Sequence, residues 1–204
     1  MTDTATRTAY DAVATLYADM FRDVLDGLPL DRGMITGFAE LVPPGPVADL
    51  GCGPGHLTAV LHSLGLDASG LDLSPAMIAR ARADHPHLRF DEGTMTALDV
   101  PDGGLAGILA WYSFIHMEPA DLPAVLAEFH RVLAPGGHLL LAFQSTDGTE
   151  TEAFDHKVAL AYRWPIDALA DLTRRAGLTE VARFLRRPTE IERFPAGNLL
   201  VRKP

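Results

Sequence analysis

The amino-acid sequence predicts an α/β fold, in which one doubly wound and mostly parallel sheet of seven strands carries helices on both faces. Short apolar segments alternate with helical patterns from residue 47 to the end of the chain, and this alternation favours an open sheet. The segment Leu105–Trp111 is apolar without polar alternation, as expected of a strand buried on both faces. The length of 204 residues fits one domain, so we interpret residues 1–204 as a single unit.

Two helices are expected before the first strand. In the segment from Tyr10 to Leu25, apolar side chains recur at helical spacing, namely Val13, Leu16, Tyr17, Met20 and Val24. Asp31 is the expected N-cap of the second helix, which the sequence Pro43-Pro44-Gly45-Pro46 ends. We expect residues 1–42 to cap one side of the sheet.

The first half of the sheet should contain four strands with two helices between them. Ser74 is the expected N-cap of the second of these helices, because Pro75 follows at the position where helices tolerate proline. The first helix is expected at residues 56–64. The four strands are expected at Val47–Leu50, Ala68–Leu73, Leu88–Phe90 and Leu105–Trp111.

The second half should add three strands and two helices. Pro135-Gly136-Gly137 separates a helix from the fifth strand, and Gly177 ends the last helix. Residues 144–164 show no clear period, and we expect an irregular segment there. The expected helices are Leu122–Leu133 and Pro165–Ala176, and the expected strands are His138–Phe143, Leu178–Leu185 and Asn198–Arg202.

Composition excludes several classes of protein. The net charge of −10 disfavours nucleic-acid partners, which require clustered cations. Cys52 is the only cysteine, so neither a disulfide scaffold nor a multi-cysteine zinc site is expected, and the histidines show no metal-ligand spacing. The most apolar stretch, 105–115, is shorter than the roughly 20 residues of a membrane-spanning helix. We expect a soluble, cytoplasmic protein without a membrane partner or signal peptide; the oligomeric state stays open.

Charge is distributed unevenly along the chain. Residues 1–156 contain 7 basic and 22 acidic side chains, whereas residues 157–204 contain 10 and 5. Two interpretations remain open: the two parts attract each other within one domain, or a basic patch around Arg183, Arg186, Arg187 and Arg193 favours an anionic substrate or partner. Arginine outnumbers lysine 15 to 2, as is typical of GC-rich bacterial genomes.

A glycine-rich turn follows the first expected strand. The sequence Asp49-Leu50-Gly51-Cys52-Gly53-Pro54-Gly55-His56 allows a close approach of the backbone to a ligand. The free amides of the following helix suit an anionic group such as a carboxylate. The dinucleotide pattern G-x-G-x-x-G would need glycine at position 56, where the sequence has His56, so a nicotinamide-dependent oxidoreductase is disfavoured.

Three motifs in this order resemble class I S-adenosylmethionine-dependent methyltransferases that act on small molecules. They are the turn with its preceding Asp49, the segment Gly70–Met77 with Asp72, and Arg131-Val132-Leu133-Ala134-Pro135-Gly136-Gly137. The resemblance implies S-adenosylmethionine as cofactor, S-adenosylhomocysteine as product and a small-molecule methyl acceptor. It also implies an antiparallel last strand and N-terminal helices over the cofactor.

The resemblance further implies the residues that bind the cofactor. Asp49 would orient the methionine amino group, Asp72 would accept hydrogen bonds from the ribose hydroxyls, and Tyr10 would close the pocket. Thr94 stands where many relatives have the aspartate that contacts adenine. The remaining residues expected to contact the cofactor are Gly51, Gly53, Gly55, Leu73, Met77, Met95 and Trp111.

Residues beyond the fourth strand are candidates for the acceptor side. His116 is the candidate general base, because histidine titrates near neutral pH, and a structural role is an equal alternative. Residues 144–164 match the place where relatives build a lid over the acceptor. The tentative acceptor-binding residues are Tyr17, Tyr112, His156 and Tyr162; Tyr17 could instead be a core residue, and the last two surface residues.

Two further alternatives share the expected fold. A non-catalytic protein would bind the cofactor without methylating an acceptor. A protein or RNA methyltransferase draws its support from the basic C-terminal part, but the acidic chain has no added nucleic-acid module. Enzymes that methylate exocyclic amines of DNA carry the motif Asn/Asp-Pro-Pro-Tyr after the fourth strand. This sequence resembles them less, because it has Trp111-Tyr112-Ser113-Phe114 at that place. A small-molecule acceptor is therefore our preferred hypothesis.

Overall fold

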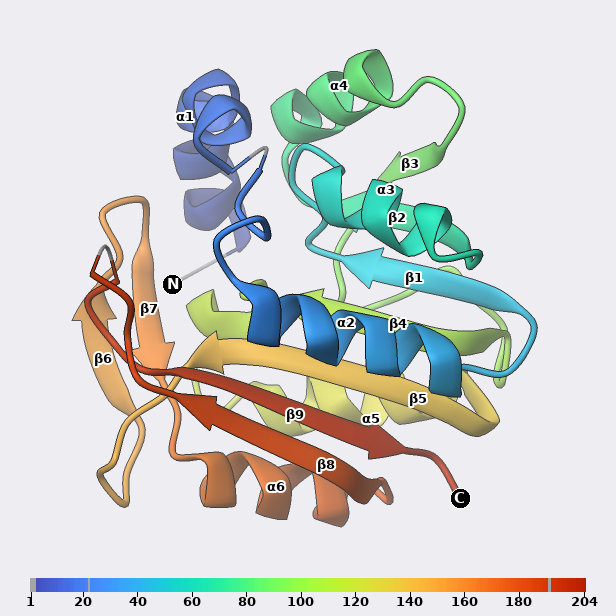
Figure 1. The fold of residues 1–204 in the computed structure, drawn as a ribbon, viewed down its shortest axis with the longest axis vertical. Coiled ribbons are helices and arrows are strands. Elements are labelled where there is room, and N and C mark those ends of the chain that lie inside the picture. The colour runs from blue at the N-terminus through green and yellow to red at the C-terminus, as the bar shows by residue number, and fades with distance from the viewer. Residues whose placement is uncertain (1–2, 22, 191) are drawn as a thin grey trace.

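Seven strands form one sheet in the order β3-β2-β1-β4-β5-β9-β8 (Figure 1). The computed structural model describes residues 3–21, 23–190 and 192–204. Strands β1 to β5 are parallel, and β9 is antiparallel to both of its neighbours. The predicted fold class is confirmed, including the antiparallel last strand. The strands are β1 Pro46–Leu50, β2 Asp67–Asp72, β3 Arg89–Glu92, β4 Leu105–Trp111, β5 Leu133–Gln144, β8 Thr179–Arg186 and β9 Ala196–Arg202.

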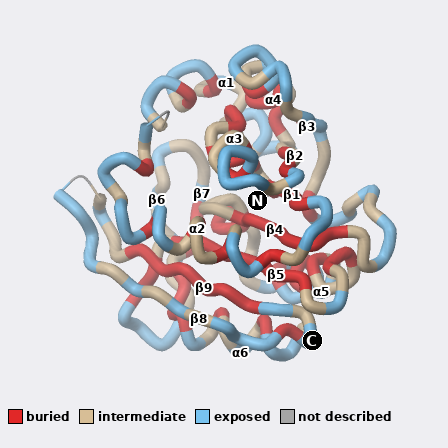
Figure 2. Tube along the Cα trace, turned by 45° about the vertical axis from the view of Figure 1, so that its right-hand side comes forward, coloured by how far each residue is buried: buried red, intermediate tan, exposed pale blue. Residues whose placement is uncertain are grey.

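Helices cover both faces of this sheet. One apolar cluster joins α2 and α3 to the central strands, and a second joins α5 and α6 to the opposite face. Burial is highest in the central strands, while the outer sides of the helices are exposed (Figure 2). The helices are α1 Asp3–Phe21, α2 Pro29–Leu41, α3 His56–Ser63, α4 Pro75–Asp84, α5 Leu122–Val132 and α6 Ile166–Arg175, with a 3₁₀ turn η1 at Phe114–His116.

The N-terminal helices differ from the prediction in their bounds. Helix α1 begins at Asp3 rather than Tyr10 and ends at Phe21 rather than Leu25. Asp31 is not an N-cap, because α2 already begins at Pro29, a residue that fits the first turn of a helix. Asp31 instead lies in the first turn, fully buried, and forms an ion pair with Arg186 of β8.

The segment expected to be irregular contains a two-stranded antiparallel hairpin. Strands β6 Glu152–Asp155 and β7 Leu160–Arg163 pair with each other outside the main sheet, and Arg163 pairs with Glu152 across the hairpin. Each strand has only four residues, which is too short for a period to be recognised in the sequence. Strand β5 also begins five residues before His138, because the chain pairs with β4 at Leu133 before the register shift at the glycines.

The second helix of the first half has the predicted cap. The hydroxyl of Ser74 accepts a hydrogen bond from the Met77 amide at 3.1 Å, and Pro75 occupies the first turn. This cap places the N-terminus of α4 beside the carboxyl end of β2. In the part of the chain that the structure describes, no helix has both the length and the apolar character that a membrane crossing requires.

Candidate functional site

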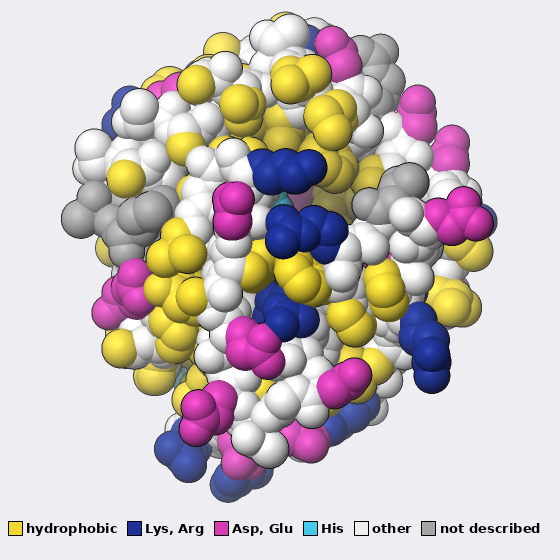
Figure 3. Space-filling view, turned by 90° about the vertical axis from the view of Figure 1, so that its left-hand side faces the viewer, with side chains coloured by type: hydrophobic (Ala, Val, Ile, Leu, Met, Phe, Trp, Pro, Cys, Tyr) yellow, Lys and Arg dark blue, Asp and Glu magenta, His cyan; other side chains and the backbone are white. Residues whose placement is uncertain are grey.

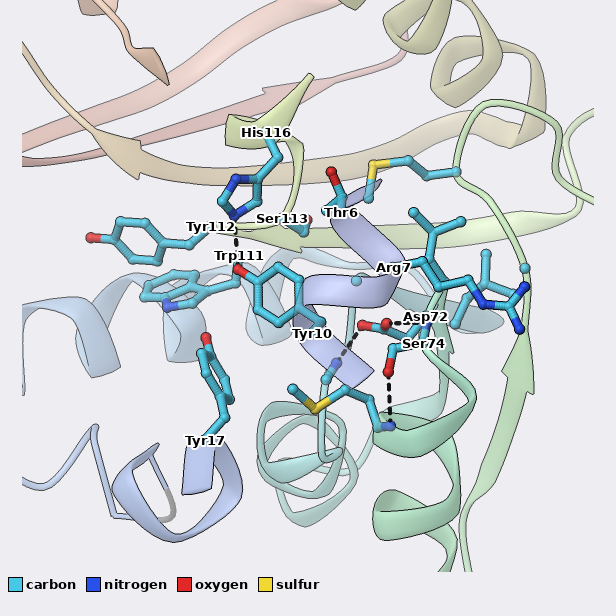
Figure 4. A pocket seen from close by; sticks show the side chains of 17 residues that line it. Thr6, Arg7, Tyr10, Tyr17, Asp72, Ser74, Trp111, Tyr112, Ser113 and His116 are labelled. Carbon is cyan, nitrogen blue, oxygen red and sulfur yellow. Dashed lines mark hydrogen bonds between the residues drawn. The ribbon is translucent and has the colours of Figure 1, made fainter. Parts of the chain in front are cut away.

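A pocket lies where the carboxyl ends of β1, β2 and β4 meet beneath α1 (Figure 4). Ligands of open α/β sheets bind at this edge, where the strand order reverses. The pocket contains about 630 Å³ of empty space, including the part open to solvent. The lining residues are Thr6, Arg7, Tyr10, Tyr17, Gly51, Gly53, Leu71, Asp72, Leu73, Ser74, Met77, Gly93, Met95, Trp111, Tyr112, Ser113 and His116.

The glycine turn forms the floor of the pocket. Gly53 has a positive φ of 54°, and a Cβ there would meet only the Tyr17 ring, at 3.9 Å, so the backbone is accessible to a ligand. Gly55 has a different role: a Cβ there would lie 2.6 Å from the Phe90 ring. Gly55 therefore permits α3 to pack close to β3, and it does not line the pocket.

Asp72 ends β2 and is held by the turn. Its Oδ2 accepts a hydrogen bond from the Gly53 amide and its Oδ1 one from the Ser74 amide, both at 2.8 Å. Each carboxylate oxygen has more than one lone-pair site, so Asp72 can accept further hydrogen bonds from a ligand. Burial raises the pKa of Asp72, against the lowering effect of these backbone amides.

Asp49 lies beneath the turn rather than in the pocket wall. Its side chain is buried, and its Oδ2 accepts a hydrogen bond from the Thr58 hydroxyl of α3 at 2.7 Å. Burial raises the pKa of Asp49 to about 7. A carboxyl group with this pKa becomes ionised when a positive charge binds nearby.

His116 projects from η1 into the pocket with a defined tautomer. Its Nδ1 lies 2.8 Å from the Leu160 carbonyl oxygen, which can only accept, so Nδ1 carries the proton. Nε2 is then an acceptor, and it takes a hydrogen bond from the Tyr10 hydroxyl at 2.7 Å. Burial lowers the pKa of His116, so the ring is neutral near pH 7.

Helix α1 closes the pocket from above. Asp11 fixes the helix to the N-terminus of α4, because its Oδ1 accepts hydrogen bonds from the Ser74 hydroxyl at 2.5 Å and the Ala76 amide at 3.2 Å. Tyr10 and Tyr17 meet edge to face, with ring centroids 5.8 Å apart. Of the two N-terminal helices, α1 lines the pocket and α2 packs on the sheet.

Trp111, Tyr112 and Ser113 form the wall at the end of β4. Trp111 and Tyr112 meet at right angles, 5.9 Å between centroids. Tyr112 has a positive φ of 53°, and Figure 4 shows its ring directed away from Asp72, to the far side of Trp111. The wall is therefore aromatic, which suits a neighbouring cation.

Several predicted site residues lie outside the pocket wall. His156 meets His116 edge to face at 5.1 Å, and Tyr162 donates a hydrogen bond to Glu118 at 2.6 Å. Thr94 bonds to the Thr96 hydroxyl. Together with Asp49 and Gly55, these residues do not line the pocket, whereas the other predicted residues do. The contacts of all of them with ligands remain predictions.

Sequence reasoning missed some residues of the wall. Thr6 and Arg7 line the pocket, and the helix that holds them begins before the expected start. Leu71 and Gly93 were missed as well. Leu71 and Gly93 stand directly before the predicted residues Asp72 and Thr94, which could have indicated them.

The suggested basic patch is mostly neutralised. Arg183 pairs with Asp167 and Glu180, and Arg186 pairs with Asp31 and Glu192. Figure 3 shows basic side chains among apolar ones on the face of α1 and the hairpin. In this region the guanidinium groups of Arg163 and Arg193 lie over the Phe194 ring, at 4.2 and 5.0 Å from its centroid.

Comparisons with known proteins agree with the geometry. Residues 47–137 match the family model described as a methyltransferase domain. The chain is 30% identical over 188 residues to malonyl-(acyl-carrier protein) O-methyltransferase of Dechloromonas aromatica, covering 87% of this chain and 68% of the relative. It is 34% identical over 140 residues to demethylmenaquinone methyltransferase of Beutenbergia cavernae, covering 67% and 57%.

The matches to curated relatives are partial, and those to solved structures are nearly complete. The matched part spans about half to two thirds of the length of these relatives. The structure resembles a 1,6-didemethyltoxoflavin N1-methyltransferase of Burkholderia thailandensis, crystallised with 1,6-didemethyltoxoflavin and S-adenosylhomocysteine. The TM-score is 0.69 at 24% identity, covering 97% of this chain and 90% of the other. At this identity, the likeness is evidence for the fold alone.

Proposed function

The chain belongs to the class I S-adenosylmethionine-dependent methyltransferases, and from this premise we propose that it methylates a small-molecule acceptor and releases S-adenosylhomocysteine. The observation that carries the proposal is Asp72 at the carboxyl end of β2. Its two oxygens are oriented by backbone amides of the glycine turn and of α4. A carboxylate in this position can accept hydrogen bonds from both hydroxyls of a ribose.

The residues of the pocket fit the cofactor part by part. Asp72 would hold the ribose, Gly53 offers accessible backbone, and Asp49 provides a carboxyl group that ionises beside a cation. Leu73 and Met77 supply the apolar wall for adenine. When bound, S-adenosylmethionine supplies a methyl group on an electrophilic sulfonium.

His116 would act as the general base. Its Nε2 faces the pocket without a proton, because Leu160 fixes the proton on Nδ1. The acceptor would replace Tyr10 as the donor to Nε2, and its proton would pass to this nitrogen as its nucleophilic atom attacks the methyl group. Positioning of the two reactants contributes most to such a reaction, and a base adds about 10²–10⁴-fold.

The relatives support a small acceptor. Two of them are named for a malonyl group on acyl-carrier protein and for demethylmenaquinone, and a structural neighbour is named for a didemethyltoxoflavin. These acceptors differ widely, so the identity of the methylated atom has to be measured in this protein.

Calorimetric titration with S-adenosylhomocysteine tests the cofactor part of the proposal. The wild-type protein is expected to bind it. Asp72→Ala is expected to bind several-fold to a hundredfold more weakly, since a charged hydrogen bond contributes about 1.5–3 kcal/mol. Binding that is unchanged in the variant would contradict the assigned role of Asp72. Binding of NAD(H) in place of S-adenosylhomocysteine would favour an oxidoreductase.

Methyl transfer from radiolabelled S-adenosylmethionine tests the acceptor part. Label in small molecules of a broad acceptor panel supports the proposal. Label in macromolecules of a lysate would favour a protein or RNA methyltransferase. Cofactor binding without any transfer would favour a non-catalytic binding protein.

A further inference from the structure

Helix α1 contributes a cation to the wall of the pocket. Among the described residues that line the pocket, Arg7 is the one with a positive charge at neutral pH, because burial lowers the pKa of His116 and keeps its ring neutral. The Arg7 side chain is 50% exposed, so it borders both the pocket and the solvent. A ligand that enters the pocket therefore meets this side chain. None of the roles proposed above involves it.

An ion pair places Arg7 beside the N-terminus of α4. Its Nε lies 3.9 Å from Oδ2 of Asp11. Oδ1 of the same carboxylate accepts hydrogen bonds from the Ser74 hydroxyl and the Ala76 amide, and the Ser74 amide donates to Asp72. Arg7 is therefore near the carboxyl end of β2, where Asp72 is assigned to the ribose.

The aromatic wall of the pocket lies on the other side of Asp72. Figure 4 shows Asp72 between Arg7 on one side and Trp111 and Tyr112 on the other. The two aromatic rings suit the sulfonium of the cofactor, since rings attract cations. A guanidinium group next to the sulfonium would repel it, and the position of Arg7 avoids this repulsion. The part of the cofactor beside Arg7 is then the nucleoside.

The wall around the expected place of the base is apolar. Leu73 and Met77 flank the N-terminus of α4, and Met95 follows β3. The Gly93 amide donates to the Asp72 carbonyl oxygen at 3.0 Å, which brings the chain before Met95 next to β2. Among the described residues of the wall, Asp72 has the only carboxylate, and no side chain has an amide group. Side chains of this kind contact a base through its flat faces.

We infer that Arg7 stacks its guanidinium plane on the adenine ring of the cofactor, an inference that rests on the proposed function. The guanidinium group is planar and weakly hydrated, and it stacks on aromatic rings and on nucleobases. Leu73 and Met77 would support the other face of the ring. Asp11 would be a positioning residue for Arg7. At 3.9 Å, beyond hydrogen-bond distance, its carboxylate attracts the guanidinium group without fixing it in a hydrogen bond.

The sheet order favours the base over the carboxylate of the methionine part as the partner of Arg7. Arginine binds carboxylates as well, so this alternative has to be weighed. The methionine part would lie over Gly51 and Gly53, between the ends of β1 and β4. Arg7 is instead tied to α4, which connects β2 to β3, and these two strands lie on the other side of β1 from β4.

Calorimetric titration with two ligands tests this inference. S-adenosylhomocysteine contains the base and the amino-acid part, whereas 5′-methylthioadenosine lacks the amino-acid part. Arg7→Ala is expected to weaken the binding of both ligands by the same factor, about fivefold to thirtyfold. Arg7→Lys keeps the charge that faces Asp11 but lacks the plane, so it should show most of the same loss. Arg32→Ala is the charge-matched control, because Arg32 of α2 is exposed and outside the pocket wall, and it should bind like the wild type.

The pattern of losses decides between the partners of Arg7. A loss confined to S-adenosylhomocysteine would assign Arg7 to the methionine carboxylate and overturn the inference. Unchanged binding in Arg7→Ala, full affinity in Arg7→Lys, or a wild-type protein that binds S-adenosylhomocysteine but not 5′-methylthioadenosine would overturn it as well. Failure of the wild-type protein to bind S-adenosylhomocysteine would instead contradict the proposed function.

Discussion

Asp49 is expected to make cofactor binding depend on pH. Burial raises its pKa to about 7, so below this pH the carboxyl group is mostly protonated, and it has to release its proton when the ammonium group of the methionine part binds nearby. Affinity for S-adenosylhomocysteine is therefore expected to rise between pH 5.5 and 7, by at most about tenfold per unit, and to level off by pH 7.5. Calorimetry across this range measures the slope. Asp49→Asn should remove it, and an equal slope in the variant would contradict the assignment.

His116 should affect turnover and not cofactor affinity. His116→Ala removes the nitrogen that accepts the proton, so turnover with an acceptor from the panel is expected to fall by about 10²–10⁴-fold. The measurements are initial rates and titration with S-adenosylhomocysteine. His87→Ala is the matched control, because His87 is an exposed histidine outside the pocket wall. If the rate of the His116 variant equals that of the wild type, His116 is not the base.

The attachment of α1 to α4 should control access to the pocket. Asp11→Ala removes the acceptor of the hydrogen bonds from Ser74 and Ala76, so α1 is expected to open more often. Hydrogen exchange measured by mass spectrometry should increase in residues 3–21 and stay unchanged in α6. Thr15→Ala, an exposed change in the same helix, is the control. Equal exchange in both variants would show that Asp11 does not hold the helix.

Elements with strong local patterns could be predicted from the sequence, and elements decided by distant contacts could not. The buried run of β4 and the cap at Ser74 need only neighbouring residues, and both were predicted. Asp31 resembled an N-cap in the sequence. Its carboxylate instead forms an ion pair with Arg186, which lies 155 residues away. The hairpin of β6 and β7 has four-residue strands, too short for a period to be recognised.

The candidate site divides in the same way. The glycine turn and Asp72 belong to short motifs, and they do line the pocket together. The hydrogen bond from Tyr10 to His116 joins residues 106 positions apart, and no local pattern predicts it.

At the scale of the whole molecule, one buried ion pair links the N-terminal helices to the last strands. Arg186→Met would leave Asp31 buried without its partner, which typically destabilises a protein by about 3–5 kcal/mol. Thermal denaturation should show a fall in Tm of about 10 °C. Arg183→Met is the control, since its ion pairs with Asp167 and Glu180 are more exposed and contribute little. Similar losses in both variants would contradict this difference.

The sheet order separates the pocket from the end of the chain. The residues that line the pocket come from residues 6–116, whereas the hairpin and the last two strands lie outside its wall. A lineage could therefore alter its final third while the inherited methyl-donor machinery stays intact. Exchanging this portion between relatives should likewise leave the donor site in place.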